Sequence, residues 1–186
     1  MQKKKETQMH DTVLLVIDTQ KGIMDSRLFA FEKVRDNIKT LIEKARDSGT
    51  EVVFVQHDDG EGSGFSIGDE DFEIFDEFKP EKSEKVFVKN VNSALHKSVG
   101  LSEYLFGKGV KKIVAVGLQT NFCIDATIHT GFDLGFEMIV PEYANSTFDS
   151  EYMSAETAYR YYNEFLWNGR FAKCVSMDDT MKMLEA

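Results

Sequence analysis

Short runs of Val, Ile, Leu and Phe recur along this chain, and segments long enough for a helix separate them. Several runs are almost continuously apolar, which is typical of strands that other layers cover on both faces. The pattern indicates an α/β protein with a mainly parallel sheet. We predict strands at Thr12–Asp18, Glu51–His57, Lys85–Lys89, Lys112–Gly117, Phe136–Pro141 and Phe171–Ser176.

The segments between these runs carry helical signals. In residues 33–48 the apolar side chains follow the i, i+3/i+4 rule, and Gly49 supplies a C-terminal stop. Alternating strands and helices form right-handed βαβ units, so we expect a three-layer α/β/α, Rossmann-like fold. Its sheet is expected to be doubly wound, six-stranded and mainly parallel. Further helices are predicted at Leu101–Phe106, Thr120–Leu134, Glu151–Trp167 and Asp178–Glu185.

Length and composition exclude several classes of protein. The 186 residues suit a single domain, 1–186, with residues 1–11 as a flexible N-terminal tail. A net charge of -10 disfavours nucleic acids and anionic membranes, which require clustered Lys and Arg. No apolar run approaches the roughly 20 residues of a membrane span, and no secretory signal is recognisable. Two cysteines form no disulfide framework, so we predict a cytoplasmic protein.

Polar residues stand where three of the predicted strands end. Asp18 ends the first strand and Lys89 the third, while Cys123 opens a helix shortly after the fourth. Ligands of open α/β sheets bind beyond the carboxyl ends of the strands, so these side chains are expected to meet in one crevice. Cys123 is then a candidate nucleophile. The alternative is a small buried cysteine with no chemical role.

A chemical role follows from the thiolate, which is the reactive form of cysteine. The first turn of a helix and a nearby Lys89 ammonium are both expected to favour the thiolate of Cys123. Asp18 is expected to accept the thiol proton and later return it to a leaving amine. Backbone N–H groups in the turn before Cys123 are candidates for an oxyanion hole.

Three motifs resemble those of the isochorismatase-like cysteine hydrolases, the superfamily of isochorismatase, nicotinamidase and N-carbamoylsarcosine amidase. They are residues 15–20, Lys89 ahead of residues 92–94, and residues 117–127, and the likeness runs from about Val13 to Thr147. The resemblance implies an Asp18–Lys89–Cys123 triad and a cis Leu118–Gln119 peptide bond. It also implies an oxyanion hole made by the N–H groups of Gln119 and Cys123, and a homo-oligomer, either dimer or tetramer.

The same resemblance separates the possible chemistries. Nicotinamidase-like members bind a metal through an Asp-x-His motif, whereas the corresponding stretch here reads His57-Asp58-Asp59. We therefore predict no metal and no cofactor. Isochorismatases hydrolyse a vinyl ether and can act without the cysteine, so retention of Cys123 favours an amide, ureide or carbamoyl substrate. A nicotinamidase-like or isochorismatase-like hydrolase of another small molecule is the alternative.

Five residues are predicted to contact the substrate. Phe65 belongs to a glycine-rich loop, residues 60–68, which we interpret as a flexible loop over the active site. The alternative is a structural histidine at position 57 and ordinary packing for the apolar residues. A flavodoxin-like or thiol-sensing protein without turnover is a more remote alternative. The predicted contacts are Gln20, Ile23, His57, Phe65 and Phe122.

Overall fold

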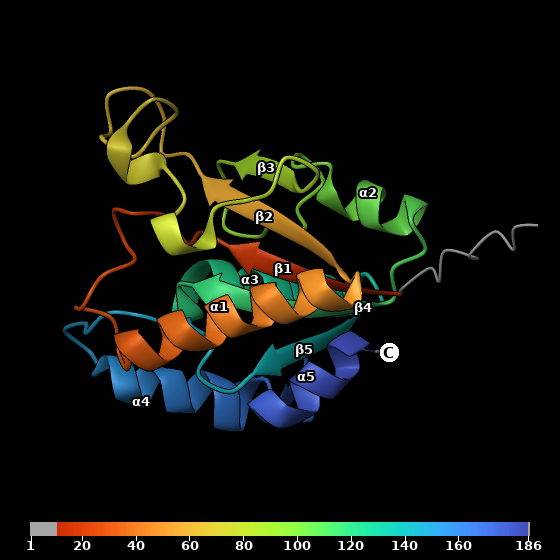
Figure 1. The fold of residues 1–186 in the computed structure, drawn as a ribbon. Helices are drawn as coiled ribbons and strands as arrows, with labels where there is room; N and C mark the ends of the chain where they lie inside the picture. Colours follow the sequence, from red (N-terminus) through yellow and green to blue (C-terminus); the bar gives the residue numbers. More distant parts are fainter. Residues whose placement is uncertain (1–10, 186) are drawn as a thin grey trace, which may run out of the picture.

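A parallel sheet forms the centre of the molecule. The computed structural model describes residues 11–185. Within these residues the sheet has seven strands in the order β3-β2-β1-β4-β5-β7, and the short β6 pairs with β4. Figure 1 labels strands β1 to β5 of this sheet. All of these strand pairs are parallel, as expected. The strands are β1 (Thr12–Ile17), β2 (Glu51–His57), β3 (Lys85–Lys89), β4 (Lys112–Leu118), β5 (Glu137–Pro141), β6 (Asn145–Ser146) and β7 (Lys173–Val175).

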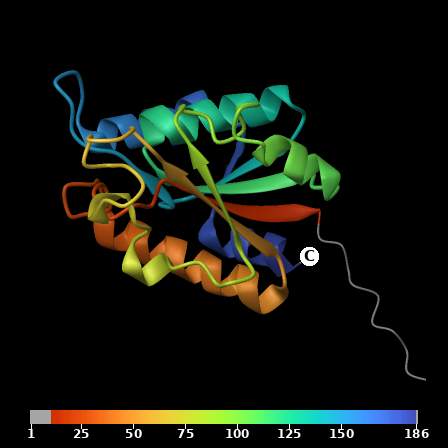
Figure 2. The same ribbon diagram turned by 90° about the horizontal axis from the view of Figure 1, so that it is seen from above.

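Helices cover both faces of this sheet, which gives the expected three layers. In Figure 2, α1 and α5 lie on one side of the sheet and α2 and α3 on the other. Strand β1 is buried throughout, and its alternate residues belong to two different cores. Leu14 packs toward α1, whereas Leu15 packs toward α2 and α3. The helices are α1 (Phe31–Ser48), α2 (Leu101–Gly107), α3 (Asp125–Asp133), α4 (Ala155–Arg160) and α5 (Met177–Glu185).

A local signal explains where helix α1 ends, and the structure corrects three other expectations. Helix α1 stops at Gly49, whose φ of 79° lets its N–H bond to the Arg46 carbonyl. Two predicted helices are only partly α-helical, because wider π-type turns occupy Thr120–Ile124 and Tyr161–Leu166. The expectation of six strands is corrected by β6, which is too short to leave a periodic signal.

The N-terminal tail falls mostly outside the described residues, which begin at position 11. Asp11 itself is fixed, because its carbonyl accepts hydrogen bonds from the N–H groups of Lys111 and Lys112. Single-domain organisation stays a prediction. Within residues 11–185, no helix combines the length and the apolar character that crossing a membrane requires.

One glycine allows the ends of β1 and β4 to approach closely. Gly117 pairs with Ile17 and has a φ of 121°. A Cβ atom at this position would lie 1.9 Å from the Ile17 carbonyl oxygen, so no larger residue fits. Asp18 follows Ile17 directly, and the turn that holds Cys123 follows β4. The close approach therefore sets the separation of two candidate catalytic residues.

Candidate active site

The three predicted catalytic side chains meet at the carboxyl edge of the sheet. Lys89 Nζ lies 2.7 Å from Asp18 Oδ2 and 3.2 Å from Cys123 Sγ. Asp18 follows β1, Lys89 ends β3, and Cys123 lies in the π-type turn between β4 and α3. All three are buried, with exposed fractions of 2%, 2% and 8% in that order. The arrangement matches the expected triad in its contacts, and the roles of its members stay predictions.

His57 is the fourth member of this cluster. It ends β2 in register with Lys89, and its Nδ1 atom lies 2.8 Å from Lys89 Nζ. An ammonium group has only donors, so Nδ1 must be the unprotonated acceptor. The ring proton then sits on Nε2, which lies 3.1 Å from Asp59 Oδ1. His57 is consequently a neutral ring whose tautomer is fixed by Lys89.

Burial controls protonation in this cluster. Burial raises the pKa of Asp18, and the Lys89 ammonium opposes that rise. Burial also raises the pKa of the Cys123 thiol to about 12, with the Asp18 carboxylate contributing and Lys89 opposing. Lys89 therefore favours the thiolate of Cys123, as expected, but desolvation and the Asp18 carboxylate together outweigh Lys89, and the resting cysteine is a thiol.

Asp18 retains one unused acceptor. Its Oδ1 atom is buried and has no hydrogen-bond partner among the described residues. A buried carboxylate oxygen without a donor is costly, because desolvation of the charge is not repaid. Asp18 also lines the open pocket beside Cys123. Oδ1 is therefore placed to accept a proton from the thiol or a hydrogen bond from a substrate.

The same residues do not suit a metal ion. Asp18, His57 and Cys123 each offer a ligand atom, and these atoms lie within 4.8 Å of one another. Lys89 Nζ already contacts all three side chains at 2.7, 2.8 and 3.2 Å, so an ammonium occupies the position that a cation would need. Asp59 also takes the remaining nitrogen of His57. The ligand atoms of Asp18, His57 and Cys123 that would face a metal ion thus already contact Lys89.

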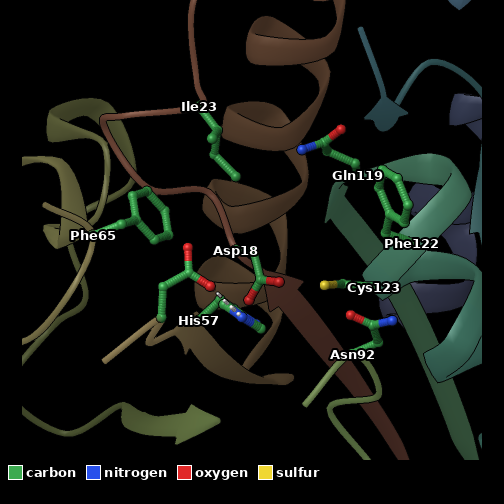
Figure 3. A pocket seen from close by; sticks show the side chains of 9 residues that line it. Asp18, Ile23, His57, Phe65, Asn92, Gln119, Phe122 and Cys123 are labelled. Carbon is green, nitrogen blue, oxygen red and sulfur yellow. Dashed lines mark ion pairs between the residues drawn. The ribbon is translucent and has the colours of Figure 1, made fainter. Parts of the chain in front are cut away.

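A cavity of about 310 Å³ opens beside Cys123. Ile23, Phe65 and Phe122 form apolar parts of its wall, and His57 lines it with Asp18 (Figure 3). Their contact with a substrate stays a prediction. Phe65 comes from the glycine-rich loop at residues 60–68 and packs close to Gly22. A small molecule that enters this cavity meets Cys123, an apolar wall and a few polar groups, which is the usual composition of a ligand site.

Two lining residues were not predicted. Asn92 and Asp59 both face the cavity, from the loops that follow β3 and β2. Each lies two or three residues beyond a predicted site residue, Asp59 after His57 and Asn92 after Lys89. Polar residues directly after a strand that already carries a site residue were the available signal.

The expected substrate contact of Gln20 needs correction. Gln20 is fully buried and is not among the residues that line the cavity. Its Nε2 donates to the His57 carbonyl oxygen at 2.9 Å, and its Oε1 accepts from the His57 N–H at 2.7 Å. Both ends of the amide are committed to the backbone. Gln20 therefore positions His57 rather than a substrate.

Gln119 begins the turn that carries Cys123. The Leu118–Gln119 peptide bond is cis, at the position that the family resemblance implies. The Gln119 carbonyl accepts hydrogen bonds from the N–H groups of Phe122 and Ile124, both at 3.1 Å. Gln119 and Cys123 both line the cavity. Their own N–H groups stay predicted, not established, members of an oxyanion hole.

Comparisons with known proteins bear on the family. The family model described as "Isochorismatase domain" matches residues 12–179. The chain belongs to the isochorismatase family of hydrolases. A secreted isochorismatase effector, Isc1, of Verticillium dahliae is 35% identical over 71% of this chain and 70% of its own length. Ureidoacrylate amidohydrolase RutB of Caulobacter segnis is 27% identical over 84% of this chain and 81% of its own length.

Solved structures of isochorismatase-family proteins share the fold described above. A cysteine hydrolase from Pseudomonas syringae pv. phaseolicola superposes with a TM-score of 0.87 at 20% identity. The match covers 98% of this chain and 96% of that one. The three-layer fold with a mainly parallel sheet is thus confirmed, whereas the substrate of this chain is not fixed by the likeness.

Proposed function

We propose that this isochorismatase-family hydrolase is a metal-independent amidohydrolase that cleaves a small amide, ureide or carbamoyl C–N bond through an acyl-enzyme on Cys123. The observation that carries the proposal is the contact of one buried ammonium, Lys89, with both Asp18 and Cys123, which line a cavity. A nucleophile beside a base, with a third group that orients the base, is the arrangement that covalent catalysis requires. The name of the relative RutB supports the same reaction class.

Asp18 moves the protons in this proposal. It takes the proton from the Cys123 thiol as sulfur attacks the carbonyl carbon, and a C–S bond forms. The C–N bond then breaks, and Asp18 returns the proton to the leaving nitrogen. Water next gives a proton to Asp18 and adds to the thioester, and the C–S bond breaks as the proton returns to sulfur. The raised pKa of Asp18 makes it a better proton acceptor than an exposed aspartate.

Lys89 and two backbone groups complete the proposed machinery. Lys89 keeps Asp18 in its ionised form and lies 3.2 Å from the sulfur, so it also stabilises the thiolate as it forms. The N–H groups of Gln119 and Cys123 are proposed to hold the carbonyl oxygen as it gains negative charge. Because the resting thiol is protonated, the thiolate is produced only as Asp18 accepts its proton.

The test is a panel of small amides, ureides and carbamoyl compounds, with ammonia release as the readout. We expect turnover by the native enzyme and a covalent adduct at Cys123, seen as an acyl mass increase after rapid quenching. Cys123→Ala should abolish both signals. Turnover of the same substrate by Cys123→Ala at the native rate would show that the covalent mechanism is wrong.

A second candidate is hydrolysis of a vinyl ether, because the relative Isc1 is named an isochorismatase. That reaction needs a proton donor at the carbon–carbon double bond and no thiol nucleophile. Isochorismate therefore belongs in the panel, and its turnover by Cys123→Ala would favour this candidate. A small-molecule substrate, a homo-oligomer and a cytoplasmic location stay predictions.

A further inference from the structure

The cavity beside Cys123 carries an unbalanced negative charge. Its described lining contains two carboxylates, Asp18 and Asp59, and neither lysine nor arginine. Lys89 compensates Asp18 from behind at 2.7 Å. Asp59 pairs with His57 Nε2 at 3.1 Å, but that ring is neutral because its Nδ1 accepts from Lys89. The carboxylate of Asp59 is therefore left without a full positive charge at the cavity wall.

The neighbouring chain strengthens this imbalance. Residues 58–77 contain no lysine or arginine. This segment lies along the turn that carries Ile23, because the Lys21 N–H donates to the Glu73 carbonyl at 2.9 Å and the Gly22 N–H to Asp71 at 3.1 Å. Lys21 forms its ion pair with Asp76, outside the cavity lining. The surroundings of the cavity mouth thus add negative potential.

The unused oxygen of Asp18 adds to this preference for positive groups. Oδ1 is buried, lacks a partner among residues 11–185, and belongs to a residue that lines the cavity. A carboxylate oxygen accepts hydrogen bonds and donates none. A ligand that presents N–H groups is compatible with this oxygen, whereas a substrate carboxylate faces two acidic residues and no cationic side chain in the described lining.

We propose that Asp59 selects substrates that carry an ammonium or guanidinium group remote from the scissile carbonyl, and that the cavity rejects substrates with a carboxylate there. The apolar walls at Ile23, Phe65 and Phe122 then contact the carbon chain between the two groups. Asp59 is half exposed and reachable, with 56% of its side chain accessible. The charge preference in binding is independent of the proposed function. Only the reaction of the bound substrate rests on the proposed function.

The first experiment measures charge preference without turnover. Methanethiosulfonate reagents of matched size, one with an ammonium and one with a sulfonate group, label Cys123 in a Cys174→Ser background. Each labelling rate is divided by the rate at which the same reagent reacts with a small thiol in solution. We expect the ammonium reagent to react at least about fivefold faster, the factor of one exposed charge pair of about 1 kcal/mol. A sulfonate reagent that reacts equally fast or faster would overturn the proposal.

Variants assign the preference to one residue. Asp59→Asn should bring the ratio of the ammonium to the sulfonate labelling rate close to one. Asp59→Lys should make the sulfonate reagent the faster of the two. Asp58→Asn is the matched control, because Asp58 does not line the cavity. Asp58 accepts a hydrogen bond from the Gly60 N–H at 2.8 Å, and the carboxamide oxygen of asparagine can accept the same bond. High salt should reduce the native ratio without any substitution. An unchanged ratio in both Asp59 variants would overturn the assignment.

A second experiment separates this proposal from the proposed function. Three primary amides of matched length, ending in an ammonium, a methyl or a carboxylate group, are assayed for ammonia release. We expect kcat/KM to fall in that order in the native enzyme and the order to weaken in Asp59→Asn. If no amide releases ammonia while the labelling ratio is unchanged, the amidohydrolase proposal is contradicted and the charge selectivity is not. If the amide that ends in a carboxylate is turned over fastest, the charge selectivity is contradicted and the amidohydrolase proposal is supported.

Discussion

Lys89 Nζ lies 2.7 Å from Asp18 Oδ2, and both side chains are almost completely buried. Two opposite charges in such a place depend on each other, because each alone would be an uncompensated charge in a medium of low polarity. The pair therefore links the stability of the fold to the chemistry of the site. This link yields the first prediction.

Replacement of Lys89 should be strongly destabilising. We expect Lys89→Met to lower the free energy of unfolding by about 3–5 kcal/mol, the usual cost of removing one partner of a buried pair. The double variant Asp18→Asn/Lys89→Met should recover much of this loss, because it leaves no buried charge. Urea unfolding of the native protein, both single variants and the double variant measures the coupling. Additive losses would contradict the interpretation.

Removal of the Asp18 charge should make Cys123 more acidic. The carboxylate helps to raise the thiol pKa from its ordinary 9.0 to about 12, so Asp18→Asn should move the pH profile of iodoacetamide labelling to lower pH. Cys174 is an internal control, because burial alone raises its pKa to about 12. Its profile should not move. Mass spectrometry of labelled peptides follows both cysteines at once.

The same raised pKa has a consequence for stability. A thiol whose pKa is higher in the folded than in the unfolded protein stabilises the folded state below pH 9.0, and this contribution is lost as pH rises toward about 12. The stability of the native protein should therefore fall over that range. Cys123→Ala should show a shallower fall in urea midpoints between pH 9 and 10.5.

Gly117 should tolerate no side chain. An added Cβ would lie 1.9 Å from a backbone oxygen, and φ is 121°. We expect Gly117→Ala to cost at least about 2 kcal/mol of unfolding free energy. Gly107→Ala is the matched control, because nothing lies within 4 Å of its added Cβ and the residue is helical. Equal thermal midpoints for the two variants would contradict this prediction, because they would show that β1 and β4 can move apart at little cost.

Gln20 and Asn92 should behave in opposite ways. Gln20→Ala leaves the His57 N–H and carbonyl without their buried partners, so we expect a loss of about 1–3 kcal/mol in stability. Asn92 is exposed and lines the cavity, so Asn92→Ala should change KM with little effect on stability. A Gln20→Ala variant with native stability and a raised KM would restore the original substrate-contact hypothesis.

Much of this fold could be predicted from the sequence because its strongest signals are local. Strands buried on both faces must be continuously apolar, so each leaves a mark that needs no knowledge of its partners. The meeting of Asp18, Lys89 and Cys123 followed from the same logic, since polar residues at the ends of parallel strands share one sheet edge. Their assignment as a triad came from the family resemblance. The two-residue β6 has no such apolar pattern, because its pairing with β4 depends on the folded chain and not on its local sequence.

The errors at the site have a physical cause as well. Gln20 is a predicted substrate contact, but its neighbour in space is the backbone of His57, which sequence order does not reveal. Lys89 does favour a thiolate at Cys123, but burial and the neighbouring Asp18 carboxylate, which are both consequences of folding, raise the pKa of the thiol. The sequence indicates Asp59 only by its place directly after β2, because loop residues carry no periodicity that points them inward.

The reactive groups of this enzyme and the walls of its cavity come from different kinds of structure. Asp18 follows the buried strand β1, Lys89 is the buried last residue of the edge strand β3, and Cys123 lies in the turn after β4. Phe65 and Asp59 instead lie on the loop that follows β2. Replacement of that loop alone should thus give new substrate preferences to the same reaction centre. For protein engineering, residues 58–68 are a natural cassette, and the sheet that carries the chemistry can stay untouched.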